Sequence, residues 1–136
     1  MIQVIYGKKG SGKTKRLLVM ANDALKVEHG DIVFVDDDKR YMYDLRHEIR
    51  FVDASEYSVK SADMFLGFLS GMLSQNFDVT AIFIDAFMKM VNADVSTLGD
   101  FFAQLDTLAE KRNLRFVISL SGDPDTMPEF MKKYVI

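Results

Sequence analysis

Residues 7–14 of the chain are Gly7-Lys8-Lys9-Gly10-Ser11-Gly12-Lys13-Thr14. This stretch agrees with the pattern G-x-x-x-x-G-K-[ST] at every fixed position. In that pattern, successive backbone N–H groups point into one concave site around a phosphate, and the glycines allow conformations that a Cβ atom would obstruct. The sequence therefore predicts a phosphate-binding loop.

The residues of this loop have distinct expected roles. Lys13 supplies positive charge to the β- and γ-phosphates of a nucleotide, and Thr14 offers its hydroxyl to Mg²⁺. A helix that begins at Lys13 directs the positive end of its dipole toward the same anion. We therefore predict that ATP and Mg²⁺ bind here, with the nucleotide held by Gly7, Lys8, Lys9, Gly10, Ser11, Gly12, Lys13 and Thr14. The alternative is a flexible glycine-rich turn that binds nothing.

The surrounding sequence alternates between two hydrophobic patterns. Short apolar runs rich in Val, Ile, Phe and Tyr predict strands at 2–6, 31–35, 49–53, 79–84 and 114–120, with a short edge strand at 134–136. Helical spacing predicts helices at 13–28, 61–76 and 97–112. We expect Gly30 to stop the first helix and Ser96 or Thr97 to cap the last. The alternation predicts an α/β fold in three layers around a mainly parallel sheet.

Composition limits the classes of protein to consider. The 136 residues, of which 49% are hydrophobic and 27% charged, suit one folded domain over residues 1–136. A formal net charge of -3 gives no overall basic excess for nucleic acid or an anionic membrane. The absence of cysteine removes disulfides and thiol catalysis, and the residues after Met1 contain no charged leader or long apolar segment. We expect a cytoplasmic protein.

A second motif lies about 70 residues after the loop. Residues 80–85 are Thr-Ala-Ile-Phe-Ile-Asp, an apolar strand that ends in a carboxylate. With the loop, this strand resembles the Walker B segment of P-loop NTPases. The resemblance implies that Asp85 holds Mg²⁺ through a water. The alternative is an ordinary turn residue at the end of a strand.

The next strand ends in Ser119-Leu120-Ser121. Polar residues here resemble the sensor position of the ATPase branch in which this strand lies between the Walker A and Walker B strands. The resemblance favours the strand order 5-1-4-3-2, a role for Ser119 beside the nucleotide, and ATP over GTP; no N/T-K-x-D motif for guanine is present. The two serines could instead begin the turn at residues 122–124.

Two narrower resemblances concern the same motifs. The chain is similar to short stand-alone bacterial proteins labelled as twitching-motility ATPases. Pilus-retraction motors are several times longer and have a separate N-terminal domain, so this similarity does not imply motor activity. Lys8 occupies the place of the extra lysine in dimeric partitioning ATPases, which implies a nucleotide-dependent dimer, but Lys9 breaks their glycine pair.

Ala86 departs from the ATPase pattern, because many members have a catalytic Glu directly after the Walker B Asp. Hydrolysis then needs another base. Asp36 and Asp37, in the run Asp36-Asp37-Asp38 after the second strand, are the best candidates, since ligands bind outside the carboxyl ends of parallel strands. The alternative is a solvated acidic turn.

Three functions remain open on the sequence. The first is a slow Mg²⁺-dependent ATPase whose nucleotide state is recognised by an unidentified protein partner. The second is a small-molecule kinase, for which residues 86–113 offer few basic side chains for a lid. The third is a nucleotide sensor without turnover. Outside the loop, Lys39, Arg40, Arg46 and Arg50 form the only arginine-rich stretch, and one of them could clamp phosphate.

Overall fold

The computed structural model describes residues 1–136 and contains a five-stranded parallel β-sheet. The strands are β1 (Ile2–Gly7), β2 (Asp31–Asp36), β3 (Arg50–Asp53), β4 (Val79–Ile84) and β5 (Arg115–Ser121). The helices are α1 (Lys13–Ala24), α2 (Ala62–Ser74), α3 (Phe87–Val91) and α4 (Gly99–Arg112). Short 3₁₀ turns lie at Met42–Asp44, Ala54–Tyr57, Val95–Thr97, Pro124–Thr126 and Glu129–Met131.

The strands lie in the order β1-β5-β4-β2-β3, and every neighbouring pair is parallel. The predicted α/β fold is confirmed, as is the place of β5 between β1, which leads into the loop, and β4, which leads to Asp85. In the predicted order 5-1-4-3-2, β5 takes the fourth place, β4 the third and β2 the second. The parallel bridge between Val4 and Val135 takes the fifth place, beyond β1, and β3 is an additional edge strand.

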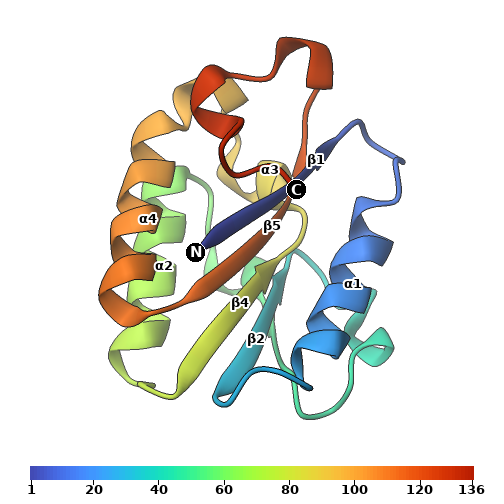
Figure 1. The fold of residues 1–136 in the computed structure, drawn as a ribbon, viewed down its shortest axis with the longest axis vertical. Helices are drawn as coiled ribbons and strands as arrows, with labels where there is room; N and C mark the ends of the chain where they lie inside the picture. The colour runs from blue at the N-terminus through green and yellow to red at the C-terminus, as the bar shows by residue number, and fades with distance from the viewer.

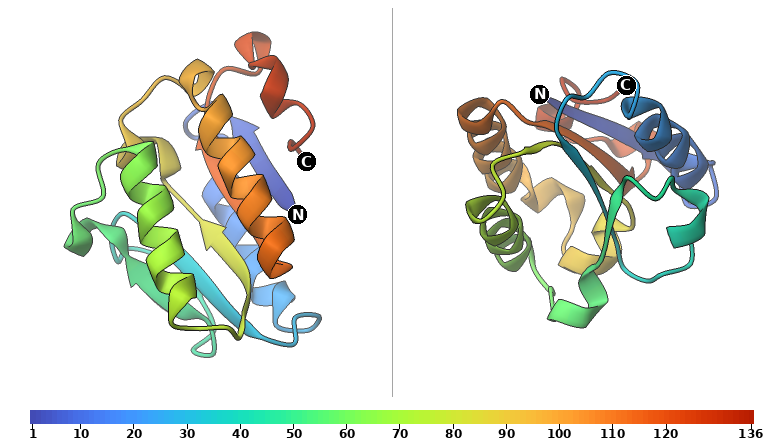
Figure 2. Two further views of the ribbon diagram at one scale, coloured as in Figure 1. Left: turned by 90° about the vertical axis from the view of Figure 1, so that its left-hand side faces the viewer. Right: turned by 90° about the horizontal axis from the view of Figure 1, so that it is seen from below.

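Helices cover both faces of this sheet. α2 and α4 lie side by side on one face (Figure 2), and α1 lies on the other (Figure 1). The buried strands are apolar on both faces because successive side chains point to opposite sides. In β2, for example, Phe34 packs with Leu17 and Ala21 of α1, whereas Val33 and Val35 pack on the side of α2 and α4.

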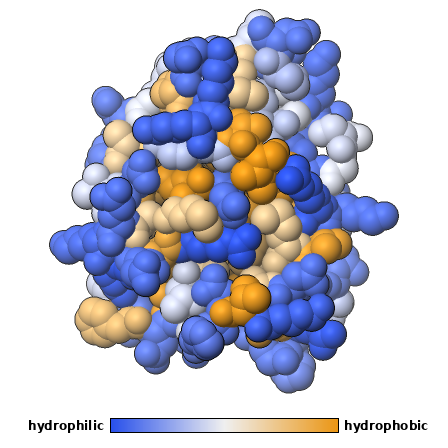
Figure 3. Space-filling view, viewed as in Figure 1, coloured by the Kyte–Doolittle hydropathy of each residue, from blue (hydrophilic) through white to orange (hydrophobic).

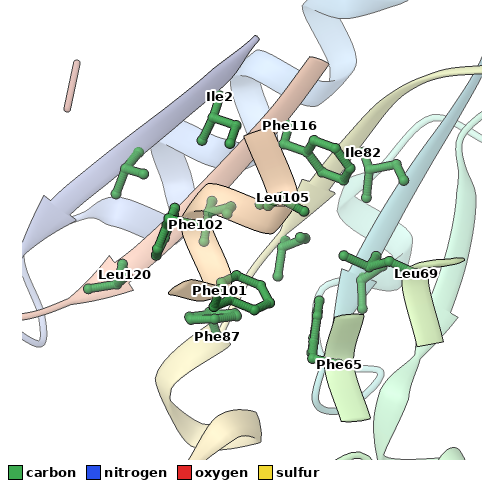
Figure 4. Close-up of a cluster of buried hydrophobic side chains, with 14 of the residues drawn as sticks. Ile2, Phe65, Leu69, Ile82, Phe87, Phe101, Phe102, Leu105, Phe116 and Leu120 are labelled. Atoms are coloured by element: carbon green, nitrogen blue, oxygen red, sulfur yellow. The ribbon is translucent and has the colours of Figure 1, made fainter. Parts of the chain in front are cut away.

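The larger core lies between the sheet and the helices α2 and α4. Its centre is a group of phenylalanine rings in edge-to-face and tilted contacts (Figure 4). The rings of Phe87 and Phe101 lie 5.1 Å apart between centroids, and Phe65 lies 5.4 Å from Phe87. Through Phe87, this core holds the segment that follows Asp85. Met90 and Val91 are also buried, so this methionine-containing segment is core.

The helix ends differ from those that the sequence predicts. α1 ends at Ala24, four residues before the predicted end, so Gly30 does not terminate it. Gly30 instead lies directly before β2, where a Cβ would collide with the carbonyl oxygen of Asp78. The predicted cap of the last helix is wrong. Asp94 accepts a hydrogen bond from the N–H of Ser96 at 3.0 Å and starts a separate 3₁₀ turn there, so α4 begins only at Gly99.

The surface gives two further facts. Polar and charged side chains cover most of the face in Figure 3, with smaller apolar groups between them. None of the helices combines the length and the apolar character that a membrane crossing requires.

Candidate functional site

The loop at residues 7–14, predicted to bind phosphate, connects β1 to α1 with two left-handed glycines. Gly10 has φ 80° and Gly12 has φ 86°, conformations that an L side chain rarely adopts. A Cβ at Gly7 would lie 2.8 Å from the Ser11 hydroxyl oxygen, so the Ser11 side chain would have to move. Gly12 is the N-cap of α1, so the free N–H groups of the first helical turn face the loop.

Lys13 folds back over the loop that precedes it. Its Nζ donates a hydrogen bond to the carbonyl oxygen of Lys8 at 2.9 Å. Burial lowers the pKa of the Lys13 ammonium, and the nearby Asp85 carboxylate opposes that shift. The ammonium group is therefore held between the loop backbone and the end of β4.

Asp85 directly follows β4 and lies beside the start of α1. The Thr14 hydroxyl donates to Oδ2 of Asp85 at 2.9 Å, and the N–H of Asp85 donates to the carbonyl oxygen of Val35 at 2.9 Å. Asp85 is only 4% exposed. These contacts place one hydroxyl and one buried carboxylate together, and both are oxygen ligands of the kind that Mg²⁺ prefers.

Asp36 ends β2, the strand next to β4, and is 2% exposed. Its Oδ1 accepts a hydrogen bond from the N–H of Asp37 at 2.8 Å, and its buried Oδ2 has no partner. Burial raises the pKa of Asp36 to about 8; the N–H of Asp37 opposes this, and the Asp85 and Asp37 carboxylates add to it. A carboxyl group is thus held in a position where its charged form is disfavoured.

The rest of the acidic run is more accessible. Asp37 and Asp38 are half-buried, and carboxylate oxygens of Asp36, Asp37 and Asp38 lie within 4.8 Å of one another. Asp38 accepts a hydrogen bond from the N–H of Arg40 at 2.8 Å, and its other oxygen lies 3.4 Å from the Arg40 guanidinium. Asp38 is therefore already paired within its own loop.

Ser119 and Ser121 lie at the end of β5, opposite Ile5 and Gly7 of β1. Ser119 is buried, and Ser121 is exposed. The N–H of Gly122 donates to the carbonyl oxygen of Gly7 at 3.0 Å and so continues the pairing with β1. The chain turns after that, where Asp123 caps the 3₁₀ turn Pro124–Thr126. Both serine positions are thus next to the loop at residues 7–14.

One cavity of about 890 Å³ brings most of the predicted residues together. Its volume is in the range of ligand-binding pockets, roughly 300–1,000 Å³. The predicted residues that line it are Lys9, Gly10, Gly12, Lys13, Thr14, Asp36, Asp37, Asp85, Ser119 and Ser121. Gly7, Lys8 and Ser11 shape the loop from outside this lining. The cavity lies at the carboxyl ends of β5, β4 and β2, where parallel sheets bind ligands.

Ala86 lines the same cavity in a left-handed conformation, with φ 54°. It is the N-cap of α3 but offers no side chain to cap the helix. An L residue in this region costs roughly 1–2 kcal/mol, which the packing of Phe87 behind it must offset. The residue after Asp85 is therefore fixed by packing and carries no acid or base.

The arginine-rich stretch separates into different roles. Arg40 alone lines the cavity. Nζ of Lys39 lies 2.7 Å from Oε1 of Glu56. The guanidinium of Arg50 lies 3.2 Å from Oδ2 of Asp31. The N–H of Arg46 donates to Oδ1 of Asn22 at 2.9 Å.

Sequence reasoning missed part of the cavity wall. Tyr41 and Asp44, from the segment between β2 and β3, line the cavity together with Leu18 of α1. Nothing local in the sequence marks these residues, because their place depends on the contact between this segment and Asn22 of α1.

No protein-family model and no curated protein matches the chain. Among solved structures, the chain is similar to the flagellar accessory protein FlaH from Methanocaldococcus jannaschii, with a TM-score of 0.49 and 14% sequence identity. The match covers 96% of this chain and 64% of that one, so the chain spans less than two thirds of the length of FlaH.

Proposed function

We propose that the chain binds ATP with Mg²⁺ in this cavity and hydrolyses the ATP slowly. The observation that carries the proposal is the hydrogen bond from Thr14 to the buried Asp85, formed beside Lys13 in a single cavity. A phosphate-binding loop needs these three groups at one point, and they come from two segments far apart in the sequence.

The triphosphate would bind in the anion site that the loop and the start of α1 form. The N–H groups at the start of α1 and the left-handed Gly10 and Gly12 provide donors around the β-phosphate. Lys13 would exchange the carbonyl oxygen of Lys8 for β- and γ-phosphate oxygens. A phosphate carries more negative charge than a carbonyl oxygen, so this exchange favours binding.

Thr14 and Asp85 fit a magnesium ion by their chemistry. Both offer oxygen atoms, and the Asp85 carboxylate is largely removed from water, so a bound cation would compensate for a charge that is costly to bury. Asp36, whose Oδ2 has no partner, lines the same cavity, but its raised pKa favours the protonated form, so Thr14 and Asp85 are the proposed ligands. When bound, Mg²⁺ would neutralise negative charge that develops on the phosphate oxygens.

The base for hydrolysis would come from the end of β2, because Ala86 offers none. In the chain without ligand, burial raises the pKa of Asp36 to about 8, so its carboxyl group is mostly protonated at neutral pH. Asp37 is more accessible and lies on the same cavity wall, so we assign it the role of accepting the proton of the attacking water. Asp36 positions Asp37 through the bond from the Asp37 N–H, and Ser119 would contact the γ-phosphate from β5.

Slow turnover and a small chain suit a protein whose nucleotide state is recognised by a partner protein. ATP is the proposed nucleotide, because the sequence has no guanine-reading motif. Lys8 is exposed in the loop. It could therefore reach the nucleotide of a second copy of the chain, so the partner could be that copy in a nucleotide-dependent dimer.

Calorimetric titration of the purified chain with ATP, with and without Mg²⁺, tests the proposal. We expect saturable binding that strengthens with Mg²⁺, followed by slow release of phosphate. GTP serves as the comparison and should bind more weakly. No binding at millimolar ATP would contradict the proposal, whereas tight binding without any phosphate release would replace the ATPase by a nucleotide sensor.

A further inference from the structure

The cavity is larger than the phosphate site. From Lys13 and Thr14 it continues past Asp36 at the end of β2 to the segment between β2 and β3. Six residues line this continuation, which we call the acidic half of the cavity: Leu18, Asp37, Asp38, Arg40, Tyr41 and Asp44.

The wall of the acidic half is fixed to the helix that starts at the phosphate loop. Nδ2 of Asn22 in α1 donates to the carbonyl oxygen of Asp44 at 3.0 Å, and Oδ1 of Asn22 accepts from the N–H of Arg46 at 2.9 Å. The N–H of Asp44 donates to the carbonyl oxygen of Tyr41 at 3.0 Å, which closes the turn between them. A ligand seated here would therefore have a defined position relative to Lys13.

Charge divides the cavity into two unlike parts. Lys9 and Lys13 line it on the side of the loop, Lys15 lines it from α1, and Lys89 lines it from α3. In the acidic half, Asp37, Asp38 and Asp44 face a single cation, Arg40. This part repels a phosphate group and attracts hydrogen-bond donors or a positive charge.

Arg40 forms an ion pair with only one of these carboxylates. Its guanidinium lies 3.4 Å from Asp38 and 5.5 Å from the centre of the Tyr41 ring. It therefore neutralises Asp38 and covers the Tyr41 ring. Asp37 and Asp44 remain as acceptors toward a ligand, and Leu18 adds an apolar contact from α1.

We propose that the acidic half binds the acceptor of a phosphoryl transfer, a small molecule with hydroxyl groups and no negative charge, such as a polyol or an amino alcohol. This inference rests on the proposed binding of Mg-ATP beside Lys13. The acceptor oxygen attacks the γ-phosphorus, and the bond from that phosphorus to the β–γ bridging oxygen breaks. The hydroxyl proton passes to Asp37, ADP leaves with the bonding electron pair, and a phosphate ester forms. Water takes the place of the acceptor when the acidic half is empty.

The test uses the full chain with ATP and Mg²⁺ and three probes of similar size: glycerol, ethanolamine and glycerate. Phosphorus NMR separates a phosphate ester from inorganic phosphate. We expect an ester from glycerol or ethanolamine and none from glycerate, whose carboxylate the acidic half repels. ATP hydrolysis without any ester would overturn the acceptor site and leave the ATPase standing. An ester from glycerate at an equal rate would also overturn it, and no ATP binding would refute the proposed function itself.

Two variants identify the residues. Asp44→Asn should raise the KM for the acceptor about tenfold, the effect of one lost charged hydrogen bond. The matched change Asp23→Asn, at an exposed position near the end of the same helix α1, should leave that KM unchanged. The rival occupant is the nucleotide base, stacked on Tyr41. If Tyr41→Ala weakens binding of ATP but not of inorganic tripolyphosphate, the base occupies the acidic half and the acceptor proposal is wrong.

Discussion

Thr14 and Asp85 are 71 residues apart in the chain, yet the Thr14 hydroxyl donates to the Asp85 carboxylate at 2.9 Å. β5 lies between β1 and β4 in the sheet. The segment after β1 therefore crosses the end of β5, and this brings Thr14 to the residue that follows β4. The backbone of Asp85 is also fixed, because its N–H donates a hydrogen bond to the carbonyl oxygen of Val35 in β2. The sheet order thus creates the predicted metal site.

Lys13→Ala should weaken Mg-ATP binding by about 2–4 kcal/mol, because the triphosphate loses its closest counter-charge and a charged hydrogen bond. The fold should remain, since the Lys13 side chain contacts only the Lys8 carbonyl oxygen by hydrogen bonding. Calorimetry measures the affinity, with Lys26→Ala, at an exposed position two residues after α1, as the control. Equal affinity for the Lys13 variant and the parent would remove the loop as the nucleotide site.

Asp85→Asn should leave much of the metal-free ATP binding but reduce the gain in affinity from Mg²⁺. The amide keeps the shape and the acceptor oxygen for Thr14 but loses the negative charge. A magnesium titration at constant ATP measures the difference, and Asp63→Asn on α2 serves as the comparison. An unchanged dependence on Mg²⁺ would exclude Asp85 from the metal site.

The parts of the site that the sequence predicts are those that depend on local pattern and on general rules of parallel sheets. The loop at residues 7–14 is recognisable because its glycines and Lys13 are consecutive in the chain. The meeting of Asp85 and Asp36 follows from the rule that carboxyl ends of parallel strands share one edge. Neither inference requires knowledge of side-chain packing.

The parts that the sequence does not predict depend on contacts between distant segments. Tyr41 and Asp44 reach the cavity because Asn22 of α1 binds the backbone of their loop. α3 is a five-residue helix bounded by left-handed Ala86 and Asn92. Asn favours that conformation at helix ends, but Ala does not, so the start of α3 is not apparent in the sequence. The acidic run is apparent in the sequence, but the burial of Asp36 alone among the three is a result of packing.

Ala86→Gly should increase the stability of the chain without ligand by about 0.5–1 kcal/mol. Glycine adopts φ 54° without the steric cost of a Cβ, which exceeds its larger loss of backbone entropy. Ala103→Gly, at an exposed position inside α4, should do the opposite and lower stability by about 1 kcal/mol. Denaturant unfolding compares the two variants, and destabilisation by both would show that Ala86 is not strained.

Asp36 should make the stability of the chain without ligand depend on pH. Its pKa in the folded state is about 8, raised above the value of 3.8 for the unfolded chain, so between these values the folded state keeps a proton that the unfolded state has lost. Stability is therefore expected to fall as pH rises from about 4 to 8.

Asp36→Asn should remove this dependence, because the amide cannot ionise, and should raise stability at pH 8 by about 1–3 kcal/mol. Thermal unfolding at about pH 5 and pH 8 measures the change, with Asp63→Asn as the control. If the parent and the Asp36 variant lose stability equally as pH rises, the Asp36 carboxyl is not the group responsible.

The last prediction concerns the base of the proposed hydrolysis, since Ala86 offers none. Asp37→Asn should lower ATP turnover by roughly 10²–10⁴, the range typical of a general base, and leave ATP affinity within about threefold. Asp38→Asn is the matched comparison with a smaller expected effect, because Arg40 already pairs with Asp38. Asp36→Asn should reduce turnover less than Asp37→Asn, since it acts only by positioning the Asp37 backbone through its Oδ1. Steady-state phosphate release measures all three variants. If all three hydrolyse ATP as fast as the parent, the acidic run contains no base and is a solvated turn beside the nucleotide.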